Sequence, residues 1–157
     1  MARVRLIVLA LLCGQVLVQP AAAVTEVARR AMIVAALDGR ATRAALDSLA
    51  ELAGQGDVGA ADTLAFVHTV GRGIPRDLPT AFRWYMKAAT LGHPEAMVNG
   101  VLVWRKMKRA EQAEAEKAMR ETLPETAIGT LKERWAEAVE TIRAREDAAK
   151  IAGGKGK

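Results

Sequence analysis

The stretch FRWYMKAATLG, residues 82–92, predicts a helix that carries its largest side chains beside small ones. Trp84 and Tyr85 stand four residues before Ala88 and Ala89, so large and small side chains share the same faces. A solitary amphipathic helix does not need small residues there, whereas a helix stacked closely against neighbours does. The stretch therefore predicts a stack of helices.

The first 23 residues have a different character from the rest of the chain. Arg3 and Arg5 precede an apolar run over residues 6–18, and Pro20 and three alanines follow. This order predicts a secretory signal peptide over 1–23, cleaved after Ala23, and export to a bacterial periplasm. The run is shorter than the roughly 20 apolar residues of a membrane span, although an uncleaved anchor helix stays as an alternative.

The mature chain expected from this cleavage, residues 24–157, contains no cysteine. Disulfides, thiol catalysis and cysteine-based metal sites are thereby excluded from it. Loss of the two leader arginines lowers the formal charge from +5 to +3. Such a mild excess is well short of what a binder of phosphate backbones concentrates on one face, so we expect no nucleic-acid partner.

The composition of the mature chain predicts an all-α fold. Alanine, leucine and arginine dominate it, and alternating runs of β-branched residues are scarce. Glycine and proline divide it into six predicted helices, over residues 25–37, 42–54, 57–70, 79–91, 93–122 and 124–151. The short connections favour antiparallel hairpins, and residues 152–157 are predicted to be a disordered tail.

An internal repeat of 36 residues runs through the chain. Gly56 and Asp57 align with Gly92 and His93, and the helices on both sides follow the same register. Further aligned pairs are Ala60 with Ala96, Ala45 with Ala81, Leu49 with Tyr85, and Ala53 with Ala89.

Residues 56–92 resemble a Sel-one-like repeat, a relative of the tetratricopeptide unit. The residues that match its pattern are Ala60, Leu64, Gly71, Gly73, Ile74, Asp77, Ala81, Trp84, Tyr85, Ala88, Ala89 and Gly92. The chain departs from the pattern at Ala65 and His68. Residues 93–104 resemble the first helix of another unit, with Trp104 at its tyrosine position, and the helix is expected to continue through 105–112 where the family has a glycine turn.

The resemblance implies a short helical-hairpin stack of the α-solenoid type, with one full repeat and flanking capping helices. We expect a single domain over 24–151, with a core repeat at 56–92, partial units at 41–55 and 93–104, and a long C-terminal helical hairpin at 105–151. The matched glycines suit the turn, Asp77 suits a helix cap, and the matched alanines leave a groove that a partner helix can approach closely.

The last predicted helix carries one narrow apolar stripe. We expect the stripe either to cap the stack by folding back on the preceding helix or to offer a coiled-coil face to a partner. Its residues are Leu131, Trp135, Ala138, Val139 and Ile142.

No catalytic, cofactor or metal constellation stands out. The two histidines, His68 and His93, have no zinc-like spacing. We expect His68 to be a partly buried core residue, and His93 to be a capping or surface residue. Neither a serine-based catalytic set nor a cofactor fingerprint is present, so the sequence predicts a non-enzymatic protein without a cofactor.

The leading hypothesis is a periplasmic adaptor or scaffold that binds a protein or peptide partner. The resemblance implies a concave binding face near Leu64, His68, Trp84 and Tyr85, and exported proteins of this family are similar to scaffolds and regulators of envelope complexes. Further candidate contacts are Trp104 and a basic patch of Arg105, Lys106, Lys108 and Arg109.

The basic patch leaves other interpretations open. It is either a solvated helix face or a docking surface for an acidic partner or anionic lipid headgroups. The alternative function is therefore an envelope protein that associates with the membrane surface through residues 105–109 or through an uncleaved signal anchor. A cell-wall hydrolase is the weakest hypothesis. The oligomeric state stays open.

Overall fold

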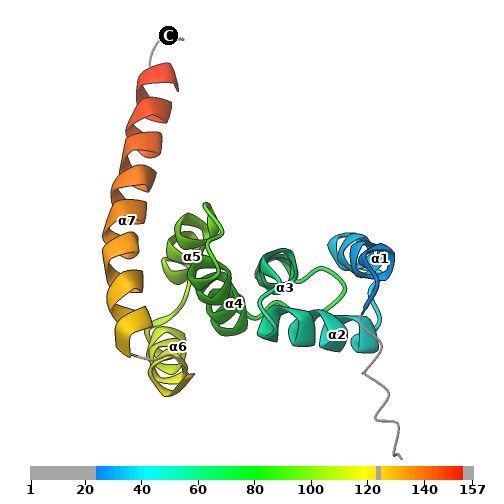
Figure 1. Cartoon of the computed structure of the whole chain (residues 1–157). Helices are drawn as coiled ribbons and strands as arrows, with labels where there is room; N and C mark the ends of the chain where they lie inside the picture. Colours follow the sequence, from blue (N-terminus) through cyan, green and yellow to red (C-terminus); the bar gives the residue numbers. More distant parts are fainter. Residues whose placement is uncertain (1–23, 123–124, 154–157) are drawn as a thin grey trace, which may run out of the picture.

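The computed structural model describes residues 24–122 and 125–153, and every regular element in them is a helix. The prediction of an all-α fold is confirmed, and the predicted signal peptide over 1–23 lies outside the described residues. Figure 1 shows the helices, which are α1 (Glu26–Leu37), α2 (Arg43–Gly54), α3 (Val58–Val70), α4 (Leu78–Thr90), α5 (Ala96–Trp104), α6 (Arg109–Thr122) and α7 (Glu125–Gly153).

The helices form an extended array in which α1 to α5 each pack on the next. α3 also contacts α1, and α4 also contacts α6 and α7, so these two helices have the most neighbours. Figure 1 shows α1 at one end of the array and the α6–α7 hairpin at the other. This arrangement is compatible with a helical-repeat fold.

Alanine is the most frequent buried residue of the two central helices, α3 and α4. Three alanines of α3 and three of α4 have no exposed surface, and the α3–α4 contact is the most extensive in the array. A methyl side chain lets two backbones approach closely, which gains dispersion contacts along the whole interface. The six residues are Ala60, Ala61, Ala65, Ala81, Ala88 and Ala89.

The turns that follow α2 and α4 are built alike, as the 36-residue repeat predicts. After α2 the N–H of Asp57 donates to the carbonyl of Leu52 at 2.9 Å, and after α4 the N–H of His93 donates to the carbonyl of Ala88 at 2.9 Å. In each turn an amide closes back on the carbonyl five residues earlier, which is the 6→1 bond of the Schellman arrangement. The amides of Arg40 and Arg72 close α1 and α3 in the same way, so this turn is common to the first four helices.

Three boundaries differ from the sequence-based expectation. The expectation of one helix over 93–122 is wrong, because α5 begins at Ala96 and residues 105–108 form a turn before α6. The N–H of Lys108 donates to the Glu111 carboxylate at 2.6 Å, and this contact caps α6 separately. The C-terminal helix is longer than expected, since α7 runs to Gly153, two residues into the predicted tail.

The loop between α3 and α4 is held by a cap at one end and a close backbone approach in the middle. Asp77 accepts a hydrogen bond from the N–H of Thr80 at 3.0 Å, which satisfies one of the free amides at the start of α4. Gly71 and Gly73 have φ angles of +72° and +75°. A Cβ at Gly73 would lie 2.6 Å from the carbonyl oxygen of Gly39, so this loop abuts the turn between α1 and α2.

An ion pair joins α1 to the start of α3. Arg29 donates to both carboxylate oxygens of Asp57, with its Nη2 at 2.8 Å from Oδ1. The same carboxylate accepts the N–H of Ala60 at 2.9 Å and so caps α3. The Arg29 guanidinium is the main reason that the pKa of Asp57 falls to about 2 from an ordinary value of 3.8.

We expect Gly73→Ala to lower the free energy of unfolding by at least about 1–2 kcal/mol, because an L side chain is strained at this φ and meets the Gly39 carbonyl. Urea denaturation followed by circular dichroism measures the change. Gly54→Ala is the matched control: a Cβ there meets nothing within 4 Å, so stability should be unchanged or slightly raised. Equal effects of the two substitutions would contradict the close approach.

We expect Asp57→Asn to remove one acid-sensitive part of the stability. Since the folded-state pKa of Asp57 lies below its ordinary value, its contribution is present above about pH 4 and is lost as the pH falls from about 4 towards 2. Urea denaturation at several pH values should therefore show a shallower decline in this window for Asp57→Asn than for the wild type. Asp47→Asn, at an exposed position of α2, should keep the wild-type profile.

Candidate functional site

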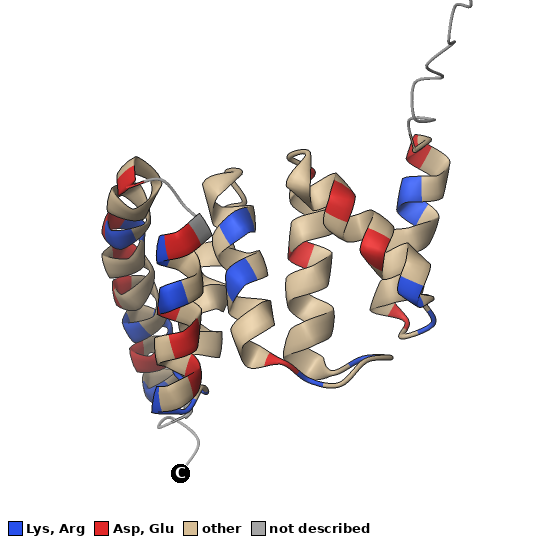
Figure 2. Cartoon of the chain, turned by 90° about the horizontal axis from the view of Figure 1, so that it is seen from below, with Lys and Arg blue, Asp and Glu red and all other residues tan. Residues whose placement is uncertain are grey.

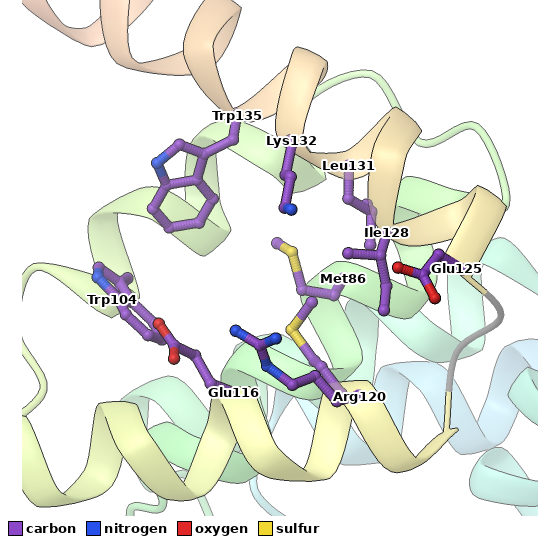
Figure 3. Close-up of a pocket in the computed structure, with 10 residues that line it drawn as sticks. Met86, Trp104, Glu116, Arg120, Glu125, Ile128, Leu131, Lys132 and Trp135 are labelled. Atoms are coloured by element: carbon purple, nitrogen blue, oxygen red, sulfur yellow. The ribbon is translucent and has the colours of Figure 1, made fainter.

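A cavity of about 610 Å³ opens between α4, α5, α6 and α7. Its volume lies in the range of roughly 300–1,000 Å³ that ligand pockets occupy. Figure 3 shows the side chains that surround it: Met86, Trp104, Glu116, Met119, Arg120, Glu125, Ile128, Leu131, Lys132 and Trp135.

Two tryptophans form the wall of the cavity where α5 meets α7. The rings of Trp104 and Trp135 lie edge to face, with their centroids 5.8 Å apart, and Phe82 of α4 lies 5.0 Å from Trp104 and 6.0 Å from Trp135. Edge-to-face aromatic pairs contribute about 0.5–1.5 kcal/mol beyond their buried area. The cluster therefore fixes α4, α5 and α7 together and gives the cavity a rigid aromatic side.

The apolar stripe of α7 brings Trp135 into this cluster. Leu131, Ala138 and Ile142 are buried, and α7 packs mainly on α5 and more lightly on α4. The helix thus covers the end of the array, which is the first of the two roles expected for the stripe.

Arg134 ties α7 to the end of α4. Its guanidinium donates to the carbonyl oxygens of Ala89 and His93, the second at 3.4 Å. Carbonyls at a helix C-terminus have no partner within the helix and carry partial negative charge. The Arg134 guanidinium donates hydrogen bonds to these carbonyls and places a positive charge beside them. It therefore fixes the position of α7 on the array.

The rim of the cavity carries charges of both signs. Glu116 and Arg120 belong to α6, Glu125 and Lys132 belong to α7, and all four are exposed. None of the four forms an ion pair with another residue in the described part of the chain. Figure 3 shows the charged ends of Arg120 and Lys132 directed into the space between α6 and α7.

The two helices of this rim carry both signs along their length, as Figure 2 shows. An apolar interior with a charged margin suits an amphipathic ligand, such as a peptide with apolar anchors and flanking charges. No group of three or more His, Cys, Asp or Glu in residues 24–122 and 125–153 is placed to hold a metal ion.

The concave face expected from the sequence lies largely in the core. Leu64 and Tyr85 are only 2% and 5% exposed, so their side chains pack inside the array. His68 and Trp84 are half-buried. Burial lowers the pKa of His68 and raises the pKa of Tyr85. Of the aromatic candidates, the structure brings only Trp104 to the cavity.

The basic patch lies on the turn between α5 and α6 and at the first residue of α6. All four of its residues are exposed, and Arg105 pairs with Glu146 of α7 at 3.1 Å. A neighbouring pair, Arg145 with Glu95 at 3.3 Å, also joins α7 to the start of α5. Lys106, Lys108 and Arg109 remain as a smaller cationic surface.

His93 lies near a carboxylate outside the cavity. Its Nε2 is 3.9 Å from Asp62, and both side chains are about one-third exposed or less. The distance is too long for a hydrogen bond. The pair thus lacks the direct contact expected of a catalytic acid–base couple.

The sequence did not identify most of the cavity. Met86, Arg120, Ile128 and Lys132 were not candidates, because the sequence shows neither the turn at 105–108 nor the packing of the C-terminal hairpin on α4. One signal was available: a glutamate three residues after Lys108 is the spacing of a helix start.

The chain was compared with protein-family models, curated proteins and solved structures, and no match was found. Within the residues that the structure describes, no helix is both long enough and apolar enough for a membrane crossing.

We expect Arg134→Met to loosen α7 and to lower the free energy of unfolding by about 1–3 kcal/mol, because two carbonyls lose a charged donor. Amide hydrogen exchange should accelerate in α7 more than in α3. Arg143→Met is the control, since Arg143 is exposed and pairs only with Glu140 on its own helix. Unchanged exchange in α7 would show that Arg134 does not hold the helix.

Proposed function

We propose that this chain is an exported, non-enzymatic adaptor that binds a protein or peptide segment in the cavity between α4 and α7. The observation that carries the proposal is the cavity itself, with its tryptophan wall, its apolar floor and a charged rim that has no ion-pair partner among the described residues. Aromatic anchors at a preformed pocket are the usual centre of a protein-binding surface.

The assignments of a non-enzymatic role and of export rest on the sequence. The resemblance of residues 56–92 to a Sel-one-like repeat supports a binding module rather than an enzyme. The basic, apolar and small-residue order of residues 1–23 supports export, with the periplasm as the proposed location.

The structure shifts the proposed binding face away from Leu64 and Tyr85. A partner cannot contact these buried side chains unless the array opens, whereas the cavity is already accessible. Apolar side chains of the partner would enter beside Trp104 and Trp135. Arg120 and Lys132 would pair with acidic groups at the edge, and such rim charges mainly set association rate and specificity.

The membrane-surface alternative rests on a different observation, the exposure of Lys106, Lys108 and Arg109 on one turn. Each cation near an anionic membrane contributes about 1 kcal/mol. The pairing of Arg105 with Glu146 leaves three cations for this role, which weakens the alternative without removing it.

A crosslinking pull-down from native envelopes tests the two functions together. We expect Arg120→Glu/Lys132→Glu to lose at least about tenfold of the captured partner, a change of about 1.4 kcal/mol or more. Lys106→Glu/Lys108→Glu changes the charge equally and should keep the partner. Circular dichroism checks the helical content of both variants.

The opposite result would support the alternative. If the Lys106/Lys108 variant alone loses sedimentation with anionic vesicles, and no variant changes protein capture, the cavity is not the functional site.

A further inference from the structure

The outer face of α1 is the most apolar exposed surface of the described chain. Seven large apolar residues of the described chain are exposed. Four of them lie on α1 or within two residues of its start, namely Val24, Val27, Val34 and Leu37. Val27 is 79% exposed and Val34 is 54% exposed, whereas α1 fully buries only Ala36. Met32 and Ile33 of α1 pack against the core, so Val27 and Val34 form a second apolar face of the same helix. An exposed apolar face of this kind commonly marks an interaction site.

The exposed residues of α1 have the spacing of a docking helix. Val27, Ala31 and Val34 stand at i, i+4 and i+7, which places them in one stripe along the helix. Such a stripe is the pattern by which an amphipathic helix anchors in a groove. Beside it lie Glu26 and Arg30, an exposed pair at 2.7 Å that supplies one charge of each sign.

The cavity at the far end of the array has complementary features. Its interior is apolar and large enough for several aliphatic side chains, and its rim holds two acidic and two basic side chains without ion-pair partners among the described residues. A helix with valines in one stripe and both charges beside it matches this surface in polarity and in charge.

The two surfaces cannot meet within one molecule. α1 packs on α2 and α3, whereas the cavity is formed by α4 to α7, and Figure 1 shows them at opposite ends of the array. Among the described residues, each molecule therefore has an uncovered helix face at one end and an open cavity at the other.

We propose that copies of this chain associate head to tail, with the outer face of α1 of one copy docked in the α4–α7 cavity of the next. The inference rests on the proposed function, since it names a second copy as the partner of that same cavity. Such a heterologous interface does not close on a dimer but continues into a ring or a filament.

Self-pairing of two α1 faces accounts for fewer observations. It would cover Val27 and Val34, but it would leave the cavity and its four rim charges without partners. Head-to-tail docking covers both surfaces with one interface.

Complementation between two blocked variants tests the geometry. The full chain, purified as the cell yields it, is studied by light scattering and sedimentation over a wide concentration range. Val27→Asp/Val34→Asp blocks the helix face, and Arg120→Glu/Lys132→Glu blocks the cavity; all four positions are exposed, so folding should be kept. Val70→Asp, an exposed site outside both surfaces, is the control.

The expected pattern is specific to a head-to-tail interface. The mass of the wild type and of Val70→Asp rises with concentration, whereas each blocked variant alone stays monomeric. An equimolar mixture of the two blocked variants forms a one-to-one dimer and nothing larger, because each has kept a different half of the interface. Tryptophan fluorescence should change on mixing, as a helix covers Trp104 and Trp135.

Other outcomes overturn the inference. Self-association of the cavity variant alone indicates pairing of two α1 faces. A wild type that stays monomeric refutes head-to-tail docking, and loss of vesicle binding in Val27→Asp/Val34→Asp would then assign the α1 face to a membrane surface. Capture of a different protein through the cavity by a monomeric wild type would leave the adaptor function standing, so the two failures are distinguishable.

Discussion

The close contact between α3 and α4 is the constraint on which the rest of the structure depends. Six alanines with no exposed surface line these two helices, and every other helix packs on one or both of them or on their immediate neighbours. A larger side chain at any of these positions would separate the backbones and create strain. The small residues that stand beside Trp84 and Tyr85 are therefore explained by packing.

The cavity follows from how the C-terminal helices meet α4. Phe82 and Met86 of α4 face Trp104, Trp135 and the α6–α7 hairpin, while Arg134 binds the carbonyls at the end of the same helix. The contacts of Phe82 with the two tryptophans hold α7 against α4 and α5, and the hydrogen bonds of Arg134 fix the position of α7 along α4. What remains between the helices is an apolar space that no side chain of the described residues fills.

The sequence predicted those parts of the fold whose signals are local. Helix periodicity, the glycines at 56 and 92, and the spacing of Asp77 before Pro79 all act within a few residues, and the helical pair α3–α4 within residues 56–92 follows from them. The candidate site could not be predicted in the same way. It depends on the turn at 105–108 and on which helix α7 meets, and contacts such as Arg134 to Ala89 join residues far apart in the chain.

The two ends of the array differ in how their apolar surface is covered, and this difference bears on function. A repeat array buries its faces through neighbouring units, so a short array needs a cap at each end. At one end α7 covers α5 with Leu131, Ala138 and Ile142. At the other end α1 shows Val27 and Val34 to solvent, and no described helix covers them. Among the described residues the array is thus covered by a helix at one end and exposes an apolar helix face at the other, and this asymmetry is the one that head-to-tail docking would use.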